Sequence, residues 1–102
     1  MSRQATLSTH VLDVSSGSPA AGVRVTLGTR TGTTDATGRI ADLGGGGIEL
    51  GSHKLVFAVG AYFAGRPHLF ETITLDVQLD EARHYHVPLL IAPFSCSSYR
   101  GT

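Results

Sequence analysis

Hydrophobic and polar residues alternate with a period of two along most of this chain, and no window shows a convincing helical period. Such alternation places successive side chains on opposite faces and is typical of half-buried strands. In the segment GVRVTLGT, Val23 and Val25 share one face and Arg24 lies on the other. The pattern predicts eight strands, at residues 5–14, 22–29, 30–34, 39–43, 52–60, 68–79, 83–92 and 94–100.

Clusters of turn-forming residues separate these strands. Ser, Gly and Pro fill residues 15–19, and an Asp-Ala-Thr-Gly turn occupies residues 35–38. Residues 44–47 are all glycine and predict a flexible loop, while residues 61–66 could form a single helical turn. Eight short strands in 102 residues predict one all-β domain, residues 1–102, folded as a β-sandwich with Greek-key links.

The same alternation predicts which histidines are accessible. If Val87 faces the core, then His84 and His86 lie on the outer face of a sheet. His10 also faces outward, because its neighbour Val11 alternates inward. Imidazoles set among apolar side chains on such a face usually mark an interface or a pocket.

Each candidate has a simpler interpretation beside it. An outward histidine is most often only solvated, and His84-x-His86 is a two-point metal grip without an obvious third ligand for zinc. Ser8 shares a strand face with His10, but no nucleophile-elbow glycines accompany it. Cys96 could pair with a histidine as a nucleophile, but an inert core residue is the commoner role. Arg39, just after a tight turn, would ordinarily be solvated, and the glycine run lacks the Lys-Ser/Thr of a phosphate loop.

Composition excludes several classes of partner. Lys plus Arg and Asp plus Glu both total 8, so the formal net charge is zero. Nucleic acids and anionic membranes are bound by basic surfaces, which argues against both. Low net charge gives little repulsion between copies and favours an oligomer. One cysteine allows no internal disulfide, and we see neither a signal peptide nor an apolar run that could span a membrane, so we expect a cytoplasmic protein.

Several motifs together resemble a known family. They are LSTHVLD at 7–13, Gly17-x-Pro19-Ala20, GVRVTL, Thr34-Asp35 with Gly38-Arg39, Tyr62-Phe63, and HYHVPLLIAPFSCSSYRGT at 84–102. In this order they resemble the transthyretin-related 5-hydroxyisourate hydrolases along the whole chain. The closing Tyr-Arg-Gly motif is similar to that of the hydrolases and is lacking in the transthyretin hormone carriers.

The resemblance implies a specific fold, assembly and reaction. It implies a transthyretin-like β-sandwich of two four-stranded antiparallel sheets, with one short helix after the fifth strand. Four chains would form a homotetramer, with active sites as grooves shared at the dimer–dimer interface. The reaction would be hydrolysis of 5-hydroxyisourate to 2-oxo-4-hydroxy-4-carboxy-5-ureidoimidazoline in urate catabolism. No metal or organic cofactor is expected.

The resemblance also implies roles for particular residues. His10, Arg39 and His86 would be catalytic, with one of the two histidines activating water and Arg39 clamping the substrate; the choice of base stays open. These groups suit the reaction, because imidazole titrates near neutral pH and a guanidinium stabilises a developing oxyanion. The residues that would bind substrate and close the pocket are Tyr99, Arg100, Gly101 and Thr102.

The chain departs from the family pattern at three places. Thr102 stands where serine is usual, Cys96 stands where tyrosine is common, and the segment before Asp35 is several residues shorter. None of these differences removes a matched catalytic group. The alternative interpretation is a non-catalytic transthyretin-like carrier that holds a small aromatic ligand in the channel between subunits.

Overall fold

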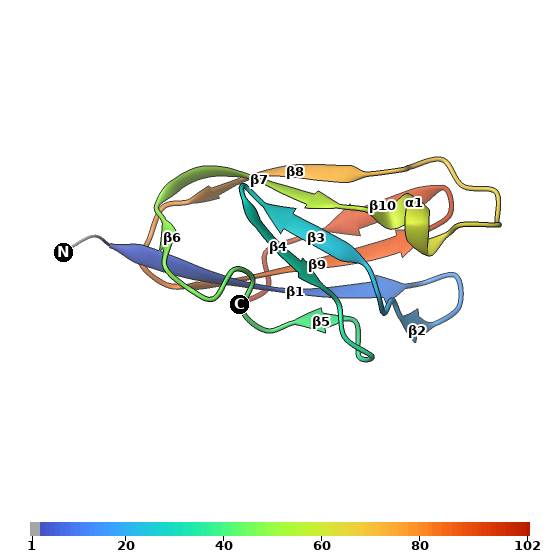
Figure 1. Cartoon of the computed structure of the whole chain (residues 1–102), viewed down its shortest axis with the longest axis horizontal. Coiled ribbons are helices and arrows are strands. Elements are labelled where there is room, and N and C mark those ends of the chain that lie inside the picture. Colours follow the sequence, from blue (N-terminus) through green and yellow to red (C-terminus); the bar gives the residue numbers. More distant parts are fainter. Residues whose placement is uncertain (1–2) are drawn as a thin grey trace.

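A computed structural model describes residues 3–102 and shows two β-sheets packed face to face (Figure 1). The molecule is elongated, with extents of 48 × 22 × 22 Å. Met1 and Ser2, which precede the first predicted strand, lie outside the described residues. Within residues 3–102, no helix has the length and apolar character needed to cross a bilayer.

The first sheet is centred on two long strands, β1 (Gln4–Asp13) and β9 (His84–Ala92), which run parallel to each other. β10 (Ser95–Ser98) pairs antiparallel with the other edge of β9. Three two-residue strands pair antiparallel with β1 and complete a sheet of six; they are β2 (Ser18–Pro19), β5 (Arg39–Ile40) and β6 (Ile48–Glu49).

The second sheet has four antiparallel strands in the order β4-β3-β7-β8. A short helix, α1 (Val59–Tyr62), follows β7 and lies at one end of the sandwich (Figure 1). The bounds of the strands are Arg24–Leu27 for β3, Arg30–Thr33 for β4, Gly51–Phe57 for β7 and Ile73–Leu79 for β8.

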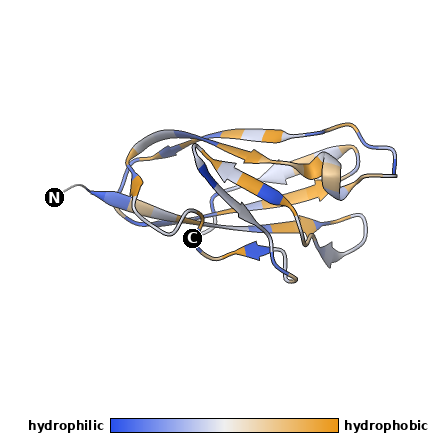
Figure 2. Ribbon diagram, in the orientation of Figure 1, coloured by the Kyte–Doolittle hydropathy of each residue, from blue (hydrophilic) through white to orange (hydrophobic). Residues whose placement is uncertain are grey.

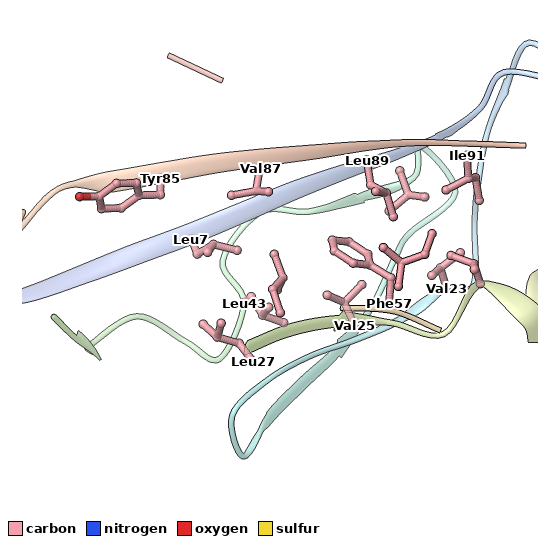
Figure 3. Packing of buried hydrophobic residues seen from close by; sticks show 14 of the residues in the cluster. Leu7, Val23, Val25, Leu27, Leu43, Phe57, Tyr85, Val87, Leu89 and Ile91 are labelled. Carbon is pink, nitrogen blue, oxygen red and sulfur yellow. The ribbon is translucent and has the colours of Figure 1, made fainter. Parts of the chain in front are cut away.

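The core lies between the sheets and follows from the alternation along the strands (Figure 3). Apolar and polar residues alternate along several strands in Figure 2, so that each sheet has an apolar inner face. Full burial of one large apolar side chain stabilises the fold by about 1.5–3 kcal/mol. Fully buried core residues include Leu7, Val11, Val25, Phe57, Leu89 and Ile91.

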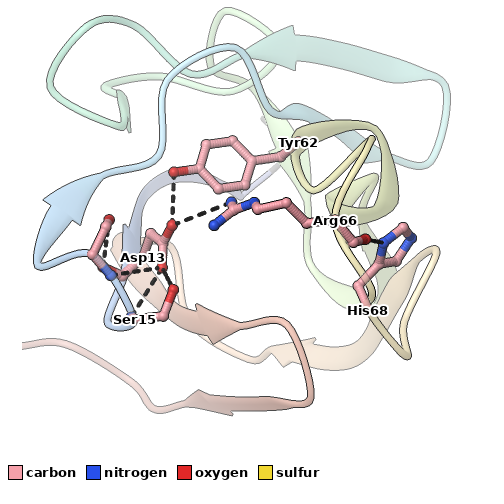
Figure 4. A network of polar contacts seen from close by, with 6 residues as sticks. Asp13, Ser15, Tyr62, Arg66 and His68 are labelled. Carbon is pink, nitrogen blue, oxygen red and sulfur yellow. Dashed lines mark hydrogen bonds and ion pairs between the residues drawn. The ribbon is translucent and has the colours of Figure 1, made fainter.

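A buried carboxylate ties the end of β1 to α1 (Figure 4). Asp13, only 1% exposed, accepts hydrogen bonds at Oδ1 from the Ser15 amide at 3.0 Å and the Ser15 hydroxyl at 2.5 Å. Its Oδ2 accepts the Tyr62 hydroxyl at 2.9 Å and lies 3.8 Å from the Arg66 guanidinium. The contacts with Tyr62 and Arg66 hold the turn after β1 against the helical end of the sandwich.

The glycine run at residues 44–47 is held by an arginine rather than left free. The Arg30 guanidinium donates hydrogen bonds to the carbonyls of Gly44, Gly46 and Gly47. All four glycines have positive φ, between 67° and 82°, which turns their carbonyls toward the guanidinium. The loop expected to be flexible is therefore closed around the first residue of β4.

The predicted all-β sandwich with one short helix is confirmed, but two details of the sheets differ. The sheets have six and four strands rather than four each, because β2 and β6 are too short to produce a visible alternation. β1 and β9 are parallel rather than antiparallel. The chain builds the second sheet between them and returns in the original direction, which alternation within a single strand does not reveal.

Several predicted element bounds were too generous. The strand expected at 68–79 begins only at Ile73, because the Leu69 amide bonds to the Pro93 carbonyl in the β9–β10 turn instead of to a neighbouring strand. The helix expected at 61–66 begins earlier, at Val59, and shortens the strand expected at 52–60. The strands expected at 39–43 and 94–100 shrink to β5 and β10.

Candidate active site

The parallel pairing of β1 and β9 brings together polar residues from opposite ends of the sequence. Directly paired residues lie on the same face of a sheet. Leu7 on β1 and Val87 on β9 are buried in the core, so the residues directly before and after each of them turn to the outer face. The pairs on that face are Thr6 with His84, Ser8 with His86, and His10 with Pro88.

β5 adds an arginine to this face. Arg39 is the direct cross-strand partner of His10. The turn before β5 is organised by the Asp35 carboxylate, whose Oδ1 accepts the Thr37 amide at 2.9 Å, the Thr37 hydroxyl at 2.6 Å and the Arg39 amide at 3.0 Å. These hydrogen bonds to its charged form lower the pKa of Asp35, with the Thr37 hydroxyl as the main cause.

Close backbone packing holds the turn against β1. The Val11 amide donates to the Gly38 carbonyl at 2.7 Å. Gly38 has a φ of 78°, and a Cβ there would lie 2.4 Å from the Val11 carbonyl oxygen, so only glycine fits. The geometry of the Asp-Ala-Thr-Gly turn is therefore tied to the strand that carries His10.

The turn also determines the tautomer of His10. His10 Nε2 lies 2.9 Å from the Thr37 carbonyl oxygen. A carbonyl only accepts hydrogen bonds, so Nε2 carries the hydrogen. When His10 is neutral, its Nδ1 keeps a lone pair and acts as an acceptor.

The other two imidazoles are joined through a serine. Ser8 Oγ lies 2.8 Å from His84 Nε2 and 2.7 Å from His86 Nδ1. Thr6 Oγ1 lies 2.6 Å from His84 Nδ1. The result is a hydrogen-bonded chain along the outer face that ends at His86, whose Nε2 takes no part in it.

Electrostatics favour the neutral form of His86. Partial burial lowers the pKa of His86 below its ordinary value of 6.5, and the nearby Arg39, His10 and His84 lower it further. A neutral imidazole near pH 7 has a lone pair with which to accept a proton. The site therefore pairs an available base with a permanently charged guanidinium.

The segment after β10 packs along β9 beside His86. The Gly101 amide donates to the His86 carbonyl at 2.8 Å, and the two residues form an isolated antiparallel bridge. A Cβ at Gly101 would lie 2.8 Å from His86 Cδ2, so a larger residue would displace either the ring or the tail. Gly101 thus lies directly against His86, and the binding of substrate by the tail stays a prediction.

The residues before Gly101 lie at a different surface. Tyr99 and Arg100 line a cleft of about 400 Å³ at the edge of the sandwich, together with β8 and the inward-facing Tyr85 and Val87. Within residues 3–102, no hydrogen bond or ion pair links Tyr99, Arg100 or Thr102 to the imidazoles. The single chain therefore gathers His10, Arg39, His86 and Gly101 but not the rest of the tail.

The structure also bears on the other interpretations of Cys96 and of the His84-x-His86 pair. Cys96 is exposed, so its expected core position is wrong; it lies on the short edge strand β10. Among the described residues, no three His, Cys, Asp or Glu side chains are grouped to hold a metal ion. Both nitrogens of His84 instead contact hydroxyl groups.

Sequence reasoning missed three residues that contact the imidazoles: Thr6 and Ser8 on β1, and Thr37 in the turn before β5. A weak signal existed for Ser8, which shares a strand face with His10. Its contacts with His84 and His86 span more than 70 positions and depend on the pairing of β1 with β9. That pairing was not predictable from alternation.

The fold and the outer face together define a transthyretin-like β-sandwich that carries a cluster of imidazoles and one guanidinium. The chain belongs to the HIUase/Transthyretin family, whose model matches residues 7–101.

Relatives of known name support this assignment. A 5-hydroxyisourate hydrolase of Mesorhizobium japonicum is 39% identical over 113 residues, covering 94% of this chain and 91% of the relative. The structure of Klebsiella pneumoniae 5-hydroxyisourate hydrolase superposes with a TM-score of 0.86 at 41% identity, covering 95% of this chain and 99% of that one. Transthyretin from Sparus aurata gives a TM-score of 0.76 at 28% identity, covering 93% and 95%.

Proposed function

We propose that this protein hydrolyses 5-hydroxyisourate to 2-oxo-4-hydroxy-4-carboxy-5-ureidoimidazoline in urate catabolism. The observation that carries the proposal is the pairing of His10 with Arg39 on the same sheet face as His86. This arrangement offers a base and an oxyanion-stabilising cation side by side. Relatives that match nearly the whole chain are named for this hydrolysis.

We assign the general base to His86. Opening the ring requires attack of water on an acyl carbon, and the water must lose a proton as it attacks. His86 has a lowered pKa, and its Nε2 lies outside the Ser8 hydrogen bond. A well-placed base contributes about 10²–10⁴ in rate.

Arg39 and His10 would bind and polarise the substrate. The planar guanidinium of Arg39 fits two oxygens of the ring and stays charged throughout the reaction. A fixed donor to a developing oxyanion contributes about 3–4 kcal/mol. The Nδ1 of His10 accepts a hydrogen bond from a ring N–H or hydroxyl of the substrate, since its Nε2 is occupied by the Thr37 carbonyl.

We further propose that the complete site forms between subunits of a homotetramer, in grooves at the dimer–dimer interface. Support comes from apolar residues that lie beside His10 on the outer face. Leu12 and Leu90 are direct partners on the face of His10 and remain half-buried in a single chain. A second subunit covering them would bring the Thr102 hydroxyl and Arg100 toward substrate from the tail.

The direct test follows the ultraviolet absorbance of freshly generated 5-hydroxyisourate. The wild-type protein should accelerate the decay well beyond the spontaneous reaction, and Arg39→Gln should lower kcat/KM by orders of magnitude. His53→Gln, a histidine on β7 outside the cluster, is the matched control and should behave as wild type.

Binding of an aromatic ligand without any acceleration would favour the carrier interpretation over the hydrolase. The assembly is tested separately by sedimentation and activity over a dilution series. Activity should disappear as the tetramer dissociates, whereas a fully active monomer would contradict a shared groove.

A further inference from the structure

The proposed roles of His10, Arg39 and His86 do not use the hydrogen-bonded chain on the outer face. It runs from Thr6 through His84 and Ser8 to His86, with separations of 2.6, 2.8 and 2.7 Å. We propose that Ser8 and His84 form a proton relay that carries a proton away from His86 as water attacks and returns it as the carbon–nitrogen bond breaks. This inference rests on the proposed function, because it requires His86 to act as the base.

The proton count of Ser8 gives the chain a direction. Its hydroxyl has one proton to donate, yet Oγ contacts a ring nitrogen of both His84 and His86. When both rings are neutral, Ser8 must donate to one histidine and accept from the other. The choice made at Ser8 fixes the tautomers of both imidazoles at once.

Two directions satisfy every hydrogen bond. In the first, His86 Nδ1–H donates to Ser8, the Ser8 hydroxyl donates to His84 Nε2, and His84 Nδ1–H donates to Thr6 Oγ1. His86 Nε2 then has a free lone pair and is competent as a base. In the second, each hydrogen bond is reversed and His86 Nε2 carries the hydrogen.

The relay links these directions to the two halves of the reaction. As the water oxygen bonds to the ring carbonyl carbon, one water proton passes to His86 Nε2. The His86 Nδ1 proton moves to Ser8, and the Ser8 proton moves to His84 Nε2, so the positive charge ends on His84. When the carbon–nitrogen bond breaks, the shifts run backward and His86 Nε2–H protonates the departing nitrogen.

The surroundings of the two rings favour moving the charge to His84. His86 is half-buried, whereas His84 is exposed and its charge would be hydrated. Thr6 Oγ1 is placed to accept the Nδ1–H of a protonated His84. The titratable or charged side chains that share the outer face with His86 are His10 on β1, Arg39 on β5 and His84 on β9. The tail beside it carries Tyr99, Arg100 and the Thr102 carboxylate, whereas Asp13 of β1 and Tyr85 of β9 are buried on the inner face.

A solvent water molecule cannot easily take the place of the Ser8 hydroxyl in the relay. Ser8 is only 9% exposed and its hydroxyl lies between the two rings, so bulk water has little access to the proton that it transfers. His84 is the point at which the chain meets solvent. Loss of either residue should therefore slow proton transfer while leaving substrate contacts intact.

The first experiment compares His84→Gln with His53→Gln. Glutamine retains hydrogen-bonding atoms beside Thr6 and Ser8 but takes up no proton. We expect kcat to fall about 10-fold, less than loss of the base itself would cost, with KM unchanged. The rate should also become dependent on the concentration of added imidazole, which accepts the proton instead. Wild-type kcat without buffer dependence in His84→Gln would overturn the relay.

The second experiment measures kcat in mixtures of H₂O and D₂O. Several protons in motion give a curved dependence in the wild type, and Ser8→Ala should make it linear while lowering kcat. Ser8→Thr keeps the hydroxyl and should restore the curvature. A linear dependence in the wild type would refute concerted transfer through the chain.

A third readout separates failure of the relay from failure of the proposed function. Nitrogen NMR of the histidine rings needs no substrate. The His84 and His86 tautomers should change together in a pH titration of the wild type and independently in Ser8→Ala. Independent titration in an active wild type overturns the relay alone, whereas coupled titration in an inactive one overturns the hydrolase and, with it, the role of the coupled hydrogen bonds in catalysis.

Discussion

β1 carries two polar networks of opposite character, one at its end and one along its outer face. At Asp13, a buried carboxylate is surrounded by donors whose hydrogens can point only one way. At Ser8, a hydroxyl lies between two imidazoles, and the hydrogens can be arranged in two ways. The comparison teaches that a network with fixed hydrogen positions can stabilise the fold, whereas a network whose hydrogens can be arranged in two ways can transfer protons.

The largest effect is expected at the base end of the imidazole network. His86→Asn retains a polar group beside Ser8 but removes the ring that takes the proton. We expect kcat to fall about 10²–10⁴-fold with an unchanged fold, measured by the absorbance assay and circular dichroism. A rate close to wild type would remove His86 from the mechanism.

The next effect should appear in stability rather than in rate. Asp13→Asn removes the charge that Ser15 and Tyr62 solvate, and hydrogen bonds to a charged group are worth about 1.5–3 kcal/mol. We expect the free energy of unfolding to fall by about 2 kcal/mol in urea titrations, with kcat nearly unchanged. Asp76→Asn, in an exposed pair with Lys54, is the control and should change stability by less than about 1 kcal/mol.

The Asp13 contribution should also depend on pH. Burial raises the pKa of Asp13, but the hydrogen bonds from Ser15, Tyr62 and Ser16 outweigh it and leave the pKa below the ordinary 3.8. A lowered folded pKa means that the stabilisation is present above the unfolded value and is lost as pH falls through the folded one. The stability gap between wild type and Asp13→Asn should therefore shrink below about pH 4.

A smaller effect on rate is expected at the tail. Gly101→Ala places a methyl group 2.8 Å from His86 Cδ2, so the ring or the tail must shift. Misplacement of a catalytic group by a fraction of an ångström should cost about 10-fold in kcat. Thr31→Ala, at an exposed position on β4 of the other sheet, is the control. Equal rates for both variants would show that the tail tolerates displacement.

The smallest effect concerns the pH profile. His86 must be neutral to act as base, and its pKa lies below 6.5 because of burial and of the neighbouring Arg39, His10 and His84. The rate should therefore stay level at neutral pH and fall only as pH drops through this lowered pKa. His84→Gln removes one of the groups that lower the pKa of His86, so the acidic limb of the rate profile should move toward higher pH. In His53→Gln this limb should not move. A limb above pH 6.5 in the wild type would contradict the assignment.

Alternation predicted the faces of the long strands but not their partners. His10 and His86 were expected to face outward because Val11 and Val87 are apolar, and both lie on the outer face. Which strands adjoin depends on the path of the whole chain through the second sheet. For that reason Ser8 could be placed on a face but not between two rings.

The turn before Arg39 was also partly predictable from the sequence. Asp35 and Gly38 predicted a tight turn before Arg39, and the turn is present. Nothing local indicated that the Thr37 carbonyl would meet His10, since that contact requires β5 to pair with β1. Cys96 was misplaced for a related reason: an edge strand leaves small apolar residues uncovered.

One oxygen atom, Asp35 Oδ1, has a consequence for how this protein could be altered. Through Thr37 it positions the carbonyl that holds His10, and through the Arg39 amide it positions the neighbouring cation. The positions of His10 and Arg39 are thereby coupled, so a substitution in the turn at residues 35–38 cannot move one of them without moving the other. Efforts to engineer a new substrate preference should therefore vary residues outside this turn and keep the turn itself intact.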